Sequence, residues 1–273
     1  MLSNKKLMEL SAVNLSVVNS YPNGLPVYFL TGKNYLYQTL YCIQSLTKVS
    51  DEKFNFILVD DGSFDEDLLC TIDRLLPNAE IIESGLIQER LDKIFPEGKF
   101  PNLNYKRRVY PHIKKLTDIH TLPGNAWKIV LDSDMLFWAE PSEIINWLRN
   151  PTNALCMQDC ESSYGYSTDL MQSLCNSETQ DLTNVGVIGL NSADIDWIAL
   201  ESWIAGLEEK EGTSYYLEQA ITAMIIGEAP LTVLPASSYI VNPTDAFGVE
   251  TAVLHHYVDL SKQYYFNQAW KTI

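Results

Sequence analysis

The stretch Lys128-Ile-Val-Leu-Asp-Ser-Asp-Met-Leu-Phe137 decides the predicted fold. Its first four residues predict a strand that enters the core, because they are mostly apolar and partly β-branched. Asp132 and Asp134 follow directly, and on an extended backbone residues two apart point to the same face. Both carboxylates can therefore bind one divalent cation at the carboxyl end of a strand. The alternative is a polar turn in which the two aspartates cap the next element.

The composition is typical of a globular protein with a large negative charge. The chain has 273 residues, of which 46% are apolar, enough for one large domain or two small ones. The formal net charge of −16 argues against a nucleic-acid partner and against a strongly anionic membrane surface. An anionic substrate would therefore need a metal ion or a local group of basic residues.

The cysteine content predicts a cytoplasmic protein. The chain has five cysteines, an odd number, and no Cys-x-x-Cys pair, which indicates reduced thiols. No apolar run reaches transmembrane length, and residues 1–18 lack the continuous apolar segment of a signal peptide. We therefore expect any membrane contact to be peripheral.

Residues 26–83 predict alternating strands and helices. Apolar runs predict strands at 26–31, 54–60 and 79–83, and apolar spacings of three to four predict helices at 35–47 and 64–76. This order is typical of parallel βαβ units with right-handed crossovers. Residues 1–24 are polar and end in a Tyr-Pro-Asn-Gly turn, so we expect a leader or a surface arm there.

The rest of the chain alternates less regularly. We expect mixed structure at 84–104, a basic helix at 106–122 and a long loop at 160–183, and loops of that length are usually functional. The remaining predicted elements are the strand at 128–131, a helix beginning at Pro141, strands at 154–159 and 184–191, helices at 195–207 and 215–226, strands at 231–234 and 251–257, and a C-terminal helix ending at Trp270.

These patterns predict the α/β fold class, with a mostly parallel central sheet flanked by helices. Neither an internal repeat nor a linker-like segment divides the chain, so we predict one domain over residues 1–273. Within it, we expect residues 25–135 to bind a nucleotide and residues 136–273 to bind the second substrate.

Polar side chains follow several of the predicted strands. Asp60 and Asp61 follow the second strand, and Asp159 ends a later one; an aspartate at a strand end can accept hydrogen bonds from a ribose or a base. The alternative for Asp60-Asp61-Gly62 is a turn that caps the next helix. Tyr35 follows the first strand, where it could stack on a base or pack in the core.

A metal site needs a further protein ligand, and the chain has only four histidines. His255 and His256 end a predicted strand, and either could complete the site; the alternative is a pair of half-buried strand histidines. Two carboxylates and an imidazole suit Mn²⁺ or Mg²⁺, and the imidazole favours Mn²⁺. Lys262 could bind the same phosphate as a point charge or lie at the surface as an ordinary lysine.

The order of these motifs resembles GT-A-fold glycosyltransferases, above all the retaining family 8 type, which includes lipopolysaccharide galactosyltransferases and glycogenin. The similarity covers residues 26–262. The matching motifs are Asn34-Tyr35, the strand ending in Asp60, the basic helix, Leu131-Asp-Ser-Asp-Met-Leu-Phe137, Asn184-Val-Gly186, Glu218-Gln219 and His256-Tyr257-x-x-x-x-Lys262.

The resemblance implies a single GT-A-like domain that transfers a sugar from a nucleotide diphosphate sugar, expected to be a UDP-hexose, with retention. The acceptor would be a carbohydrate or a lipid-linked glycan. Asp132, Asp134 and His256 would hold the metal, and the other implied positions follow by role. Asn34, Tyr35, Asp60, Asp61, Arg107, Arg108, Gly186 and Lys262 would bind the donor, while Asp159, Asn184, Glu218 and Gln219 would line the sugar and acceptor side.

The chain departs from the family pattern at several positions. Gly32-Lys33 stand where an acidic residue usually precedes Asn-Tyr, and Asp259 and Gln263-Tyr264 replace a glycine and a Pro-Trp pair. Val59-Asp-Asp-Gly-Ser63 is similar to family 2 inverting enzymes, although their Gln-x-x-Arg-Trp motif is absent. Two other hypotheses are a sugar nucleotidylyltransferase, for which the first loop has few glycines, and a GT-A-shaped binding protein without catalysis.

Overall fold

The computed structural model describes residues 2–244 and 251–273. The described chain divides into two compact units that are interleaved in sequence. Unit 1 comprises Met1–Glu83, Leu131–Pro151 and Leu234–Ile273, and unit 2 comprises Ser84–Val130 and Thr152–Val233. The predicted functional division of the domain at residue 135 stays a prediction.

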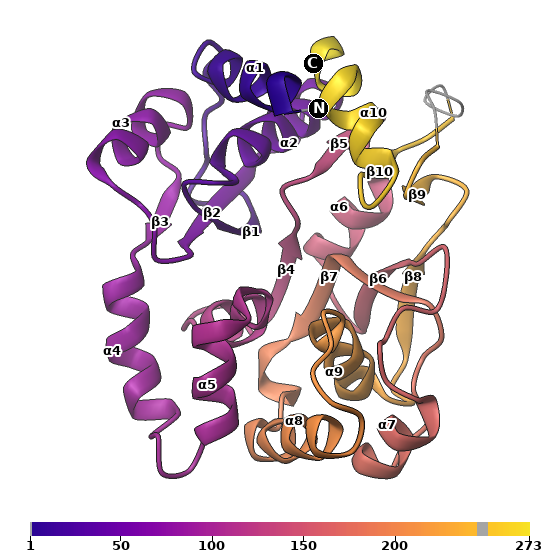
Figure 1. Cartoon of the computed structure of the whole chain (residues 1–273). Coiled ribbons are helices and arrows are strands. Elements are labelled where there is room, and N and C mark those ends of the chain that lie inside the picture. Colours follow the sequence, from indigo (N-terminus) through magenta and orange to yellow (C-terminus); the bar gives the residue numbers. More distant parts are fainter. Residues whose placement is uncertain (1, 245–250) are drawn as a thin grey trace. The chain divides into compact units, whose positions relative to one another are not determined.

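Unit 1 contains the predicted βαβ repeat (Figure 1). Its strands β1 (Leu25–Thr31), β2 (Phe54–Asp60) and β3 (Glu80–Ile82) are parallel, and α2 (Leu36–Val49) and α3 (Glu66–Leu75) connect them. The strands β1 and β2 form because most of their apolar residues are buried, and in β2 the run from Phe56 to Asp60 is wholly buried. The register pairs Thr31 with Asp60, so both strands end at the same edge of the sheet.

The N-terminal segment differs from the expected surface arm. Residues Leu2–Ala12 form helix α1, which lies against α2 and α10 (Ser261–Asn267) (Figure 1). Met8 and Ala12, four residues apart, are buried, while Leu7 and Leu10 stay exposed. The helix was missed because only one narrow side of it is buried, and the polar residues around that side hide the period.

A second, three-stranded sheet in unit 1 positions the later histidines. Strand β10 (Leu254–His256) runs antiparallel to β5 (Met135–Phe137) and parallel to β9 (Tyr239–Val241). The register pairs His256 with Met135, and the Tyr257 amide donates to the Asp134 carbonyl at 2.9 Å. This pairing brings the end of the chain next to the Asp-x-Asp turn. Unit 1 also contains α6 (Ser142–Arg149), predicted from Pro141, and the final turn η4 (Ala269–Thr272).

The larger sheet has seven strands in the order β3-β2-β1-β4-β7-β6-β8 and is mostly parallel, as predicted. Its other strands are β4 (Trp127–Leu131), β6 (Ala154–Gln158), β7 (Thr183–Asn191) and β8 (Leu231–Leu234), and β6 and β7 are antiparallel. The predicted helices of unit 2 are α8 (Trp197–Glu211) and α9 (Leu217–Ile226). None of the helices in residues 2–244 and 251–273 is long and apolar enough to cross a bilayer.

Unit 2 also differs from the prediction in three segments. Residues 84–104 contain α4 (Ser84–Ile94) and the start of α5 (Pro101–Val109) instead of mixed structure. The expected basic helix breaks at Pro111 into η1 (Pro111–Ile113) and a π-helical turn η2 (Lys115–Ile119), because proline cannot continue α5. The expected loop at 160–183 contains α7 (Thr168–Cys175), which ends at Asn176 in the left-handed conformation.

Candidate active site

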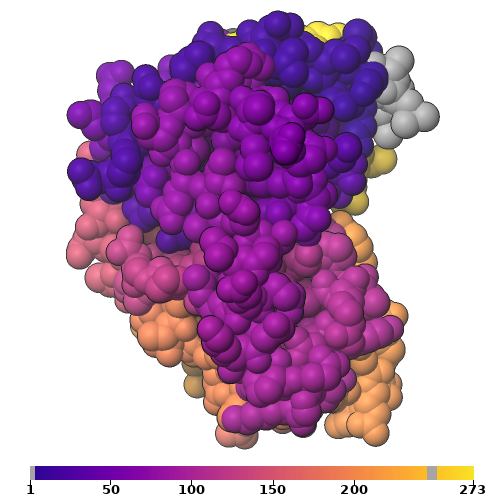
Figure 2. Space-filling model, turned by 90° about the vertical axis from the view of Figure 1, so that its left-hand side faces the viewer, coloured from indigo at the N-terminus to yellow at the C-terminus, as the bar shows by residue number. Residues whose placement is uncertain are grey.

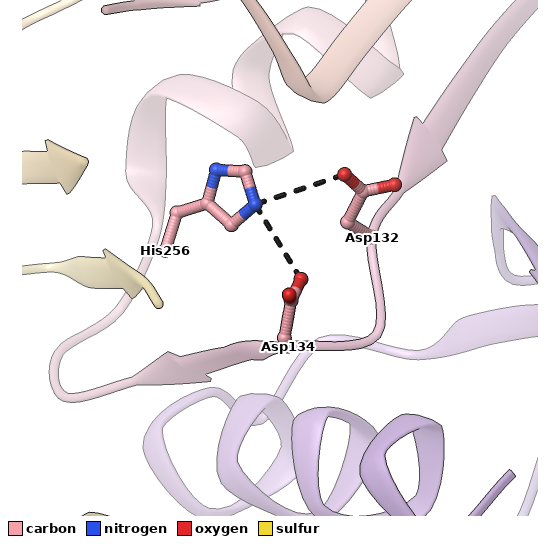
Figure 3. Close-up of side chains that lie close together, drawn as sticks. All are labelled: Asp132, Asp134 and His256. Carbon is pink, nitrogen blue, oxygen red and sulfur yellow. Dashed lines mark ion pairs between the residues drawn. The ribbon is translucent and has the colours of Figure 1, made fainter. Parts of the chain in front are cut away.

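Three predicted metal ligands converge in unit 1. Asp132 follows β4, Asp134 precedes β5, and His256 ends β10 (Figure 3). His256 Nε2 lies 3.7 Å from Asp132 Oδ2 and 3.4 Å from Asp134 Oδ1, and one ligand atom from each residue lies within 4.8 Å of the others. His256 is buried and the two aspartates are half-buried, so the group opens toward solvent on the carboxylate side.

A chain of hydroxyl groups holds the turn that carries the two aspartates. Ser133, between them, is buried, and its Oγ lies 2.8 Å from Thr39 Oγ1 on α2. Thr39 Oγ1 in turn lies 2.8 Å from Thr31 Oγ1 at the end of β1. Because Ser133 points inward to this chain of hydroxyls, its neighbours on either side point outward toward His256.

The carboxylate of Asp134 is held in its ionised form. Burial raises its pKa, but the hydrogen bond and charge of His256 and the charge of Lys262 outweigh this and hold the pKa well below its ordinary value. Lys262 Nζ lies 3.3 Å from Asp134 Oδ2. Two carboxylates and one imidazole nitrogen are donors that Mn²⁺ and Mg²⁺ accept, so the residues fit such an ion.

The two adjacent histidines have different environments. His255 points to the opposite face of β10, where Nδ1 lies 3.2 Å from Tyr257 Oη and the ring packs edge-on against Trp138. Burial lowers the pKa of His255 to about 4, so its imidazole is neutral at pH 7. His256 is thus the histidine that lies beside the aspartates, which the sequence left open.

Lys262 reaches the site because of an unusual backbone turn. Asp259 adopts a left-handed conformation with φ 44°, two residues before the helix α10 that carries Lys262 on its first turn. The family pattern has glycine here, and the structure retains the conformation that glycine favours. Aspartate tolerates this region better than most residues, which explains how the departure is accommodated.

We expect substitutions of Asp259 to show this constraint. Asp259→Val should lower the free energy of unfolding by about 1–2 kcal/mol, because a β-branched residue is strained in the left-handed region. Asp259→Gly should leave it within about 0.5 kcal/mol, since relief of strain offsets the added freedom of the unfolded chain. Chemical denaturation measures both. Leu260→Val, at an exposed neighbour with φ −67°, is the matched control; equal losses for the two valine variants would contradict the argument.

The loop after β2 packs against the end of β1. Asp60 Oδ1 accepts from the amides of Gly62, Ser63 and Phe64 at 2.8, 2.9 and 3.0 Å, so Asp60 forms a turn, as in the alternative interpretation. The cap of the next helix α3, however, is Asp65 and not this turn. Asp61 Oδ1 accepts from the Ser63 amide at 3.0 Å. A Cβ at Gly32 would lie 2.0 Å from Asp61 Oδ1, so a larger residue there would displace this carboxylate.

Asn34 and Tyr35 lie on the exposed turn before α2. Tyr35 is 50% exposed, which rules out the core-packing alternative. Asn34 is exposed as well. Lys33, where the family pattern has an acidic residue, directs Nζ to Asp65 Oδ2 at 3.3 Å.

Three of the four predicted sugar-side residues, Asp159, Asn184 and Gln219, form one hydrogen-bond network in unit 2. Asp159 Oδ2 accepts from Asn184 Nδ2 at 3.0 Å and from Gln219 Nε2 at 3.1 Å. Asn184 Oδ1 accepts from the Gly186 amide at 3.0 Å. Because Asn184 and Gln219 are buried, the network fixes the orientation of both amide side chains.

Glu218 has a partner that the sequence did not single out. Its carboxylate lies 3.0 Å from Lys115 Nζ, and both residues are buried. Lys115 Nζ also donates to the Val185 carbonyl at 3.4 Å. The sequence shows several basic residues between positions 106 and 115 in an otherwise acidic chain, but their spacing gave no reason to choose Lys115 as the partner of Glu218.

The two predicted arginines have protein partners of their own. Arg107 donates from Nε and Nη2 to both oxygens of buried Asp118, at 2.8 and 3.0 Å. Arg108 is exposed, and Nη2 lies 3.5 Å from Glu97. Their predicted role toward a diphosphate stays a prediction, and Arg107 is already neutralised where it lies.

Comparison with known proteins agrees with the topology. No protein-family model matches this sequence, and no curated protein matches it in sequence. Solved structures do match: the galactosyltransferase LgtC in complex with donor and acceptor sugar analogues has a TM-score of 0.57 at 14% identity, covering 86% of this chain and 87% of LgtC. Mouse xyloside xylosyltransferase 1 has a TM-score of 0.55 at 15% identity, covering 88% of this chain and 97% of that one. The chain has the GT-A fold.

The predicted fold class is thereby confirmed, including the mostly parallel sheet flanked by helices. At these identities the likeness shows the fold alone. In this GT-A fold the Asp-x-Asp turn follows β4, in the middle of the strand order.

Proposed function

We propose that this protein is a metal-dependent glycosyltransferase that takes a sugar from a nucleotide diphosphate sugar, expected to be a UDP-hexose. The observation that carries the proposal is the convergence of Asp132, Asp134 and His256 Nε2 within 4.8 Å, on a GT-A fold. A second support is Lys262, whose ammonium group lies 3.3 Å from Asp134.

The residues that we propose to bind the donor lie in unit 1. Asp132, Asp134 and His256 would hold Mn²⁺ or Mg²⁺; when bound, the ion supplies positive charge that stabilises the leaving diphosphate. Lys262 adds a second positive charge at the same group and needs no proton transfer to act. Tyr35 is exposed and offers its ring to the base, and Asn34 and Asp61 offer polar groups for the ribose or base.

The residues that we propose to bind the transferred sugar and the acceptor lie in unit 2. We propose that Gln219, Asp159 and Asn184 bind hydroxyl groups of the transferred sugar or of the acceptor, a carbohydrate or lipid-linked glycan. Their mutual hydrogen bonds hold them in one arrangement before substrate arrives, which lowers the cost of binding. Glu218 is included in this side of the site because it directly precedes Gln219 in the chain. The Gly186 amide orients Asn184 by its hydrogen bond to the side-chain oxygen. Retention of configuration is part of the proposal.

A donor screen tests the proposal directly. The protein is screened against a panel of nucleotide diphosphate sugars, with and without about 1 mM Mn²⁺. One donor should raise the melting temperature only when the ion is present, because a ligand that binds the native state stabilises it. Release of UDP from that donor, inhibited by chelator, identifies an enzyme. Stabilisation without turnover, even with candidate glycan acceptors, would indicate a binding protein, and pyrophosphate release from a nucleoside triphosphate would indicate a nucleotidylyltransferase instead.

A further inference from the structure

We propose a second ligand site in unit 2, a phosphate site formed by Arg90, His120, Lys128 and Ser192, which we call the basic cluster. Arg90 lies on α4, His120 follows η2, Lys128 lies on β4 and Ser192 begins the turn η3 (Ser192–Asp194). None of these residues has a role in the proposed sugar transfer. The ligand class is a phosphate group, free or as part of a small ester.

The centre of the basic cluster is a buried amine linked to a hydroxyl. Lys128 is 1% exposed, and its Nζ donates to Ser192 Oγ at 2.9 Å. Ser192 Oγ also lies 3.0 Å from His120 Nδ1. Since the ammonium group can only donate, the hydroxyl accepts from Lys128 and gives its own proton to Nδ1. The neutral imidazole then carries its proton on Nε2.

Two buried donors of the basic cluster have no acceptor. Within the part of the chain that the structure describes, His120 Nε2 and Arg90 Nη1 are buried and have no hydrogen-bond partner. An unpaired buried donor costs about 1–3 kcal/mol, and an acceptor bound between these groups would remove that cost. His120 is 4% exposed, so water reaches its ring poorly.

The basic cluster also lacks a counter-charge. The chain has 35 acidic and 19 basic residues, yet among the described residues no carboxylate forms an ion pair with Arg90 or Lys128. Burial, together with the nearby Arg90 charge, lowers the pKa of Lys128 to about 8, so the amine stays mostly protonated at pH 7. Two adjacent cations without an anion are costly, and an oxyanion would remove this cost while accepting the free donors.

A cavity lies near the C-terminal end of α4, and we assign it to the body of an ester. The cavity, of about 440 Å³, is lined by Lys93, Phe100, Trp197 and Ile198 among others. Lys93 and Ile94, which also line it, lie three and four residues after Arg90, and therefore on the same face of α4. Figure 2 faces the side of the molecule that carries α4, and the helix lies at that surface. None of the four residues of the basic cluster lines this cavity; we place the aromatic or alkyl group of an ester there because the cavity walls are aromatic and apolar.

Phosphate titration tests the basic cluster. In the presence of chelator, inorganic phosphate should raise the melting temperature of the wild-type protein in a saturable way, and calorimetry should show one site. Arg90→Gln and Lys128→Met should each weaken binding at least tenfold. Lys262→Met should leave the phosphate affinity unchanged, which separates this site from the proposed donor site. Without phosphate, Lys128→Met should melt no lower than wild type, because it removes an unpaired buried charge.

Two ligands distinguish the source of the phosphate. If the cavity is used, phenyl phosphate should bind at least tenfold more tightly than inorganic phosphate, and Ile198→Glu should abolish only this gain. Equal affinities would identify free phosphate as the ligand. The site is refuted if wild type, Arg90→Gln and Lys128→Met respond identically to phosphate without saturation, as in a general salt effect. Loss of binding in Lys262→Met alone would refute it as well, by assigning the phosphate to the donor site.

Discussion

Asp134→Asn should reduce kcat for sugar transfer by roughly 10³-fold or more, with little change in the folded structure. The substitution keeps the shape of the side chain but removes the charge that a divalent ion needs. It also removes the acidic partner of His256 at 3.4 Å and of Lys262 at 3.3 Å, so both groups lose their common anion. Loss of a single electrostatic stabiliser at a reacting centre typically costs 10²–10³-fold in kcat, and a metal ligand lies at the upper end.

The experiment measures kcat and the apparent Mn²⁺ affinity with the donor identified by the thermal screen. Asp132→Asn should behave like Asp134→Asn, because its Oδ2 belongs to the same ligand group. Asp73→Asn is the matched control, since Asp73 is exposed on α3 in the same unit. Wild-type turnover in either site variant, or turnover that chelator does not affect, would rule out the metal-dependent mechanism.

Much of the fold was predictable because its strands are buried on both faces. Strands such as β1, β2 and β7 read as nearly continuous apolar runs, and their predicted bounds agree with the structure to within one residue. The short strands β5 and β9 were not predicted, since three residues carry too little pattern. Helix α7 was missed because only Leu170 and Met171 on it are buried.

The candidate site was predictable where local chain geometry decides it, and not where tertiary pairing does. The spacing of Asp132 and Asp134 predicts a shared direction, and both carboxylates do lie near His256, although residues 133 and 134 form a bend and do not continue the strand. The choice between His255 and His256 depends on the register that pairs His256 with Met135, which no local rule gives. The partner of Glu218 was likewise hidden, because Lys115 meets it through the packing of η2 near α9 and β7.

That buried pair leads to the second large effect: Lys115→Met should lower the free energy of unfolding by about 3–5 kcal/mol. The substitution removes the ammonium group 3.0 Å from Glu218 and leaves a buried carboxylate without its cation. The charge cannot move to solvent, because Glu218 is only 4% exposed. Chemical denaturation measures the loss, and a lower kcat should accompany it, since Gln219 directly follows Glu218 in α9.

A double substitution shows whether the charge is the cause. Lys115→Met combined with Glu218→Gln should recover most of the lost stability, because no unpaired charge remains and replacing both partners of a buried pair is often neutral. Lys6→Met is the control: its pair with Glu9 is exposed, 60% and 44%, so it should cost less than about 1 kcal/mol. If the double variant is no more stable than Lys115→Met, packing of the lysine stem and not its charge stabilises this part of unit 2. Recovery of stability without recovery of kcat would separate the two roles of the pair, because Glu218→Gln restores the fold but not the charge beside Gln219.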